Sequence, residues 1–141
     1  MKPPPLPGAH QTHAGLRKEL CIFFIGLGVL LAIPAYFALS GISGNPPPLW
    51  GLPRHLAIGV PVAILSALHL FSGTLLAVLD RRLFGVAGAI SSTLITIFYA
   101  VFMYAATGDI PTNLISIVIA AIPFVVWSRV SKFLSTTSSL K

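Results

Sequence analysis

Four long apolar stretches limit what this 141-residue chain can fold into more than any other feature of its sequence. They cover residues 20–43, 55–79, 83–107 and 111–128, and none of them contains Lys, Arg, Asp or Glu. A membrane-spanning helix needs about 20 mostly apolar residues, and backbone groups in lipid must hydrogen-bond within their own segment. We therefore predict that each stretch is a transmembrane α-helix.

The composition agrees with this prediction. Hydrophobic residues make up 55% of the chain and charged residues only 9%, whereas an average soluble domain carries about 25% charged residues. So few charges cannot cover a water-soluble surface, and so high a hydrophobicity excludes a disordered chain. The composition predicts an integral membrane protein whose immediate partner is the lipid bilayer.

The links between the apolar stretches are short. Residues 44–54 include four prolines, which disfavour a helix, and residues 80–82 and 108–111 suffice only for tight turns. Short links make successive helices antiparallel neighbours. We predict an all-α fold, an up-down bundle of four transmembrane helices that fills residues 19–131.

The residues outside the bundle are predicted to be tails. Residues 1–18 form a Pro-containing tail that we expect to be disordered, and residues 132–141 form a polar tail. With this topology, Arg54 is the one basic residue on its side of the membrane, and the other eight Lys and Arg lie on the opposite side. Basic residues concentrate on the cytoplasmic side. Both termini are therefore predicted to be cytoplasmic, in a multi-pass protein of the cell membrane (plasma or inner membrane).

His69 is the most informative polar residue within the predicted helices. It lies ten residues before the end of the 55–79 stretch, about 15 Å from that boundary and close to the membrane midplane. Ionisable residues at this depth are rare and are candidates for function. Ser66 and Ser72 lie three residues before and after it, on the same helical face. This small, polar face is expected to look into the bundle.

The third apolar stretch offers a partner for His69. Ser92, Thr96 and Tyr99 follow one another at spacings of four and three, so they form one polar stripe on a helix. Reflection through the turn at residues 80–82 places Ser91, Ser92, Thr93 and Thr96 at a depth similar to that of His69. We predict that His69 hydrogen-bonds Ser92 or Thr96 inside the bundle.

Other local patterns have simpler interpretations. Arg81 and Arg82 are candidate contacts for anionic lipid headgroups, although the setting of topology accounts for them equally well. Small residues recur every fourth position, which permits close helix packing within the bundle, in a homo-oligomer or in a larger membrane complex. The longest such series are Gly59, Ala63 and Ala67, and Gly88, Ser92, Thr96 and Ala100. Three prolines, at positions 34, 61 and 123, are expected to bend their helices and to free a carbonyl.

No pattern of catalytic residues or metal ligands is present, and the basic residues are not arranged to grip nucleic acid. His55 and His69 lie 14 residues apart on one predicted helix, about 21 Å along its axis, so they cannot flank one haem iron within one subunit. A dimer could still offer two copies of His69 to one iron. We expect no cofactor, no metal and no nucleic-acid partner, and the sequence favours a protein that is not an enzyme.

Two functions are compatible with these features. The first is a non-enzymatic accessory subunit, scaffold or regulator. The alternative is a small transporter or channel-like protein that uses His69 and the polar stripe. The layout resembles that of small multidrug transporters, but these depend on a Glu inside the first helix, and Glu19 lies at the mouth of this one.

Overall fold

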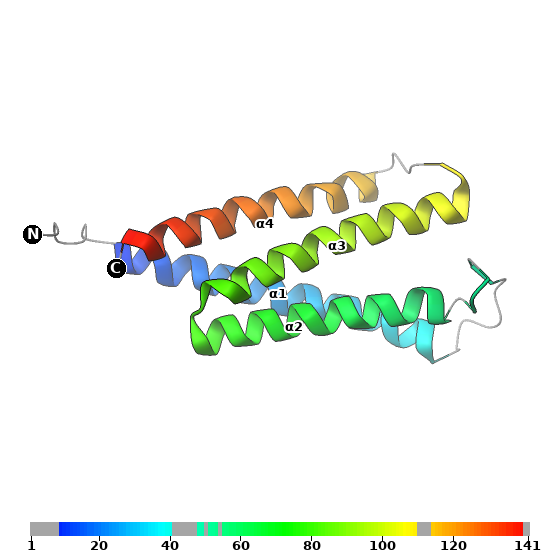
Figure 1. Ribbon diagram of the computed structural model, residues 1–141, viewed down its shortest axis with the longest axis horizontal. Helices are drawn as coiled ribbons and strands as arrows, with labels where there is room; N and C mark the ends of the chain where they lie inside the picture. Colours follow the sequence, from blue (N-terminus) through cyan, green and yellow to red (C-terminus); the bar gives the residue numbers. More distant parts are fainter. Residues whose placement is uncertain (1–8, 41–47, 50, 54, 110–113, 140–141) are drawn as a thin grey trace, which may run out of the picture.

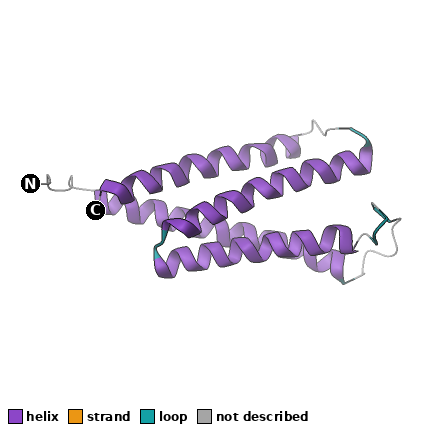
Figure 2. Cartoon of the chain, viewed as in Figure 1, coloured by secondary structure: helices purple, strands orange, loops and turns teal. Residues whose placement is uncertain are grey.

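The computed structural model describes residues 9–40, 48–49, 51–53, 55–109 and 114–139. These residues form four long helices, α1 (Ala9–Leu39), α2 (Val60–Leu79), α3 (Arg82–Thr107) and α4 (Leu114–Ser139), and a short π-helix, η1 (His55–Gly59), that leads into α2. Figure 2 shows how completely helix dominates the described chain. All four spans are long and apolar enough to cross a membrane, with η1 and α2 counted as one.

Successive helices run antiparallel, as predicted (Figure 1). α1 packs against α2, α2 against α3, α3 against α4, and α4 returns to α1, so the four helices close into a ring. We call the end that holds the turn between α2 and α3 the Asp80 end, and the end where α3 finishes the Gly108 end. At the Asp80 end, α1 and α4 extend beyond that turn (Figure 1).

Left-handed backbone conformations end α2 and α3. Asp80 has φ 47° and its N–H bonds the carbonyl of Leu76, while Gly108 has φ 78° and its N–H bonds the carbonyl of Tyr104. The tight turn predicted at residues 80–82 is thus present. Residues 110 and 111 of the turn predicted at residues 108–111, and most of the Pro-rich link, lie outside the described residues.

The two terminal helices are longer than predicted. α1 begins at Ala9 and not at residue 20, and α4 continues to Ser139 and not to residue 128. The assignment of residues 9–18 and 132–139 to tails therefore differs from the structure, while residues 1–8 and 140–141 lie outside the described part. Apolar positions continue at helical spacing beyond the membrane-length runs, and Leu16, Val130 and Phe133 are buried together there.

The hydrophobic core lies between the bundle centre and the Asp80 end. Phe24 of α1 is completely buried, and its ring occupies the space that the missing side chain of Gly88 leaves on α3. α1 and α2 also approach closely, because Gly28 faces the backbone of Leu70 and Gly73 faces the backbone of Ile25. The small residues at these helix crossings are therefore used within the bundle itself.

The π-helix has a local cause. Pro61 has no N–H to donate, and its ring crowds the carbonyl four residues earlier, at Ala57. Regular α-helical bonding cannot continue through this point, and residues 55–59 adopt the wider π-helical turn. The predicted helix over residues 55–79 is present, with the irregularity in its first five residues.

Candidate functional site

His69 lies at the centre of the bundle with none of its surface exposed. Its Nδ1 atom is 2.9 Å from the carbonyl oxygen of Leu65 and 2.9 Å from the Ser91 hydroxyl, and its Nε2 atom is 3.1 Å from the Ser92 hydroxyl. The His69 and Phe24 rings also form a T-shaped contact, with their centroids 6.0 Å apart. Both ring nitrogens are thus bonded inside the protein.

These partners serve either neutral tautomer of the ring. With a proton on Nε2, His69 donates to Ser92, whose own proton goes to the Gly88 carbonyl at 2.9 Å, and Ser91 donates to Nδ1. With a proton on Nδ1, His69 donates to the Leu65 carbonyl and Ser92 donates to Nε2. No heavy atom has to move between the two arrangements. Both ring nitrogens are therefore hydrogen-bonded in either neutral form of the ring.

The two serines predicted beside His69 on α2 do not hydrogen-bond to it. The Ser66 hydroxyl donates a 2.7 Å hydrogen bond to the Gly28 carbonyl, which joins α2 to α1 rather than to His69. Ser72 is buried, with 3% of its surface exposed, but it shares no hydrogen bond with His69. The polar face around His69 does look into the bundle.

The stripe on α3 contributes only Ser92 to the His69 cluster. The Thr96 hydroxyl donates to the Ile119 carbonyl at 3.0 Å, and the Tyr99 hydroxyl bonds Ser116 at 3.2 Å, so these two residues join α3 to α4. Ser91 was missing from the predicted stripe, because it lies one residue off the helical spacing that defines it. Its depth had nevertheless placed it among the residues expected to lie at the level of His69.

A cavity of about 200 Å³ lies between His69 and the Gly108 end. All four helices and η1 contribute to its wall, which consists of apolar side chains together with Tyr99. Its deepest members, Leu65 and Ile95, are themselves buried, and His69 does not line it. Ser91 and Ser92 are likewise not among the residues that line it.

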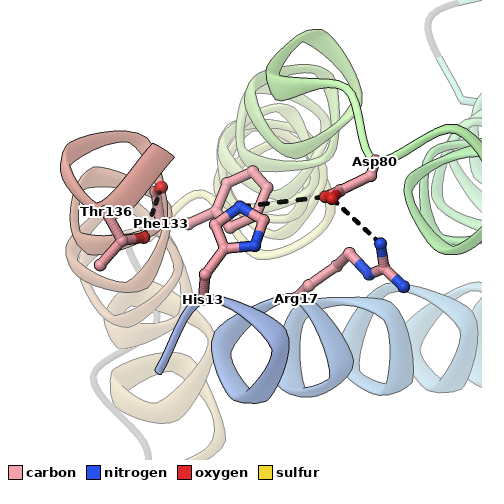
Figure 3. A network of polar contacts seen from close by, with 5 residues as sticks. All are labelled: His13, Arg17, Asp80, Phe133 and Thr136. Atoms are coloured by element: carbon pink, nitrogen blue, oxygen red, sulfur yellow. Dashed lines mark hydrogen bonds and ion pairs between the residues drawn. The ribbon is translucent and has the colours of Figure 1, made fainter. Parts of the chain in front are cut away.

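A second polar cluster closes the Asp80 end (Figure 3). The Arg17 guanidinium lies 3.1 Å from one carboxylate oxygen of Asp80, and Nε2 of His13 lies 3.9 Å from the other. The His13 ring also stacks on Phe133, with centroids 4.8 Å apart. The cluster therefore fastens α1 to both the α2–α3 turn and α4.

The two candidate contacts for lipid headgroups, Arg81 and Arg82, directly follow Asp80 in the chain. Arg81 is exposed and Arg82 is half-buried, and neither forms an ion pair with another described residue. Within the described part of the chain, no three His, Cys, Asp or Glu side chains lie close enough together to hold a metal ion.

Comparison with protein-family models, curated proteins and solved structures gives no match for this chain. The geometry of the sites described above therefore carries the functional argument. The fold and the four apolar helices are compatible with a small membrane protein.

Proposed function

We propose that this chain is a small multi-pass protein of the plasma or inner membrane that acts as an accessory subunit, scaffold or regulator and carries out no chemistry of its own. Both its termini face the cytoplasm in this proposal. The closure of the bundle around His69 supports it best, because a transporter needs a polar route to the group that handles its substrate.

The distribution of charge supports the orientation. The start of α1 and the end of α4 lie at the Asp80 end of the bundle (Figure 1). Basic residues from three helices gather at this end, whereas α3 ends at the opposite side without any. Because basic residues favour the cytoplasmic side, the Asp80 end is the cytoplasmic end.

α4 is the helix best placed to meet a partner. In the most apolar 18-residue segment of α4, 11% of the residues are buried in the bundle. In the corresponding segment of the span that contains α2, 39% are buried. The exposed face of α4 carries the small residues Ala121 and Ser128 beside Phe124, whose exposed fraction is 78%. Small residues let a second helix approach closely in lipid. This face fits a helix of another copy or of a larger membrane complex.

A flux assay tests the absence of transport. The full chain is reconstituted into liposomes, and proton and ion movement is followed under an imposed gradient. We expect the same leak as in protein-free liposomes. A saturable flux that His69→Gln abolishes, while the helical circular dichroism is retained, would overturn the proposal in favour of a transporter.

Site-specific photo-crosslinking tests the partner surface. Benzoylphenylalanine replaces Phe124 on α4 or, as a matched control, Phe71 on α2, which is also exposed, by 62%. We expect a protein adduct in native membranes from position 124 and only lipid adducts from position 71. Adduct mass separates a second copy of this chain from a different protein, and an absence of protein adducts at position 124 would count against this surface.

A further inference from the structure

We infer that an aminophospholipid of the cytoplasmic leaflet binds in a groove between α1 and α4, with its headgroup between Glu19 and Arg129. The groove has a volume of about 160 Å³. Its floor is formed by Leu20 and Val126, which are almost completely buried, and its walls by Phe23 and Val125. This inference rests on the membrane placement proposed above and is independent of whether the protein transports anything.

The groove fits a stretch of acyl chain. Apart from the two charged residues at its mouth, every lining side chain is apolar. An apolar cavity of about 150 Å³ stays dry and accepts a benzene-sized hydrocarbon. A groove of this size on the lipid-facing side of two helices therefore accepts a segment of one hydrocarbon chain and excludes a polar headgroup.

The mouth of the groove lies at the edge of the apolar zone. Glu19 immediately precedes the uncharged residues 20–39 of α1, and Arg129 immediately follows the uncharged residues 114–128 of α4. The two charged side chains thus lie at the same level, where hydrocarbon gives way to lipid headgroups. The groove extends from that level into the hydrocarbon.

The two charges match the two charges of a phosphoethanolamine headgroup. Oε2 of Glu19 lies 3.4 Å from Nη1 of Arg129, and both side chains stay substantially exposed, by 59% and 49%. An exposed pair of this kind is weak, so sharing it with a ligand costs little. Arg129 keeps further N–H donors for a phosphate, and Glu19 keeps acceptor sites for a primary ammonium group.

A retention experiment tests this assignment. The full chain is reconstituted in bilayers that contain phosphatidylethanolamine, phosphatidylcholine and phosphatidylglycerol in equal amounts, extracted with mild detergent, and analysed for bound lipid by mass spectrometry. We expect phosphatidylethanolamine to be enriched about two- to fivefold over the bulk, the range that one exposed ion pair supplies. Equal retention of the three lipids, or preferential retention of phosphatidylglycerol, would overturn the inference.

Two variants separate the contributions of the headgroup contacts. Glu19→Gln is expected to abolish the preference for phosphatidylethanolamine over phosphatidylcholine, while Arg129→Gln lowers the retention of all three lipids. Matched controls are Asp109→Asn, an exposed carboxylate at the other end of the bundle, and Lys132→Gln, one turn beyond Arg129 and outside the groove. Control variants that reproduce these losses would show general electrostatic attraction instead of a site.

A measurement on the unaltered chain keeps the inference testable if either variant fails to fold. Phosphatidylethanolamine with a photoreactive group on its acyl chain is activated in the bilayer, and the adducts are mapped by mass spectrometry. We expect them to concentrate on Leu20, Phe23 and Val125, above the level obtained with the matching phosphatidylcholine. Adducts spread evenly over the exposed helix faces would contradict the inference, while loss of membrane insertion in carbonate extraction would contradict the proposed function as well.

Discussion

The Thr96 side chain donates a 3.0 Å hydrogen bond to the backbone carbonyl of Ile119, across the interface of α3 and α4. In a regular α-helix the N–H of residue 123 would bond this carbonyl, but residue 123 is proline and has no N–H. Thr96 therefore supplies the donor that α4 lacks. The bond joins two helices at the point where the backbone of one is incomplete.

Thr96→Val is expected to destabilise the bundle by about 1 kcal/mol, since valine keeps the shape of threonine but leaves the Ile119 carbonyl without this donor. The free energy of unfolding is measured by titration with a denaturing detergent in micelles. The decisive comparison is the same substitution in a Pro123→Ala background, where alanine restores the N–H to the helix. There we expect Thr96→Val to cost clearly less, and an equal cost in both backgrounds would refute this account of the bond.

Gly73→Ala is expected to lower stability by about 1–3 kcal/mol, the usual cost of overpacking a core. A Cβ atom at this position would lie 3.0 Å from the backbone nitrogen of Ile25 and 2.8 Å from its side chain, so α1 and α2 would have to separate. Gly26→Ala on α1 is the matched control, since a Cβ there meets nothing within 4 Å. Alanine has the higher helix propensity, so the control should be neutral or stabilising. Equal losses from the two substitutions would contradict this account, because the close contacts at Gly73 would then make no difference.

Substitutions at Asp80 separate the effect of its charge from that of its backbone conformation. Asp80→Asn removes the ion pair with Arg17 and keeps a residue that tolerates φ 47°, so it should cost less than about 1 kcal/mol. Asp80→Gly is expected to behave similarly. Asp80→Ala should cost about 1 kcal/mol more than either, because a side chain with Cβ and no polar group is strained in the left-handed region.

The salt dependence of stability separates the two effects of the Asp80 substitutions. The difference between Asp80 and Asp80→Asn is expected to shrink as the salt concentration rises, since exposed charges are screened. The difference between Asp80→Ala and Asp80→Gly should persist, because it arises from the backbone. Thermal unfolding in detergent at low and high salt measures both differences, and a salt-dependent Ala–Gly difference would contradict this separation.

The sequence by itself determined the number, type and order of the long helices. Uncharged runs of membrane length can satisfy their backbone in lipid only as helices, and links as short as residues 80–82 leave only an antiparallel connection. The depth of His69 and the small, polar character of its face also followed from helical spacing. What the length of the uncharged runs could not reveal is where the helices stop, because α1 and α4 continue as packed helices beyond the apolar runs.

Tertiary structure decided which polar groups meet. The stripe of Ser92, Thr96 and Tyr99 is one line on α3, yet Ser92 bonds α2 and the other two bond α4. A helical stripe touches two neighbouring helices when it lies over their junction, and the helix rotation that fixes this depends on packing between Phe24, Gly88 and Gly73. The pairing of Glu19 with Arg129 has the same origin, because it joins α1 to α4, the two long helices that are furthest apart in the sequence.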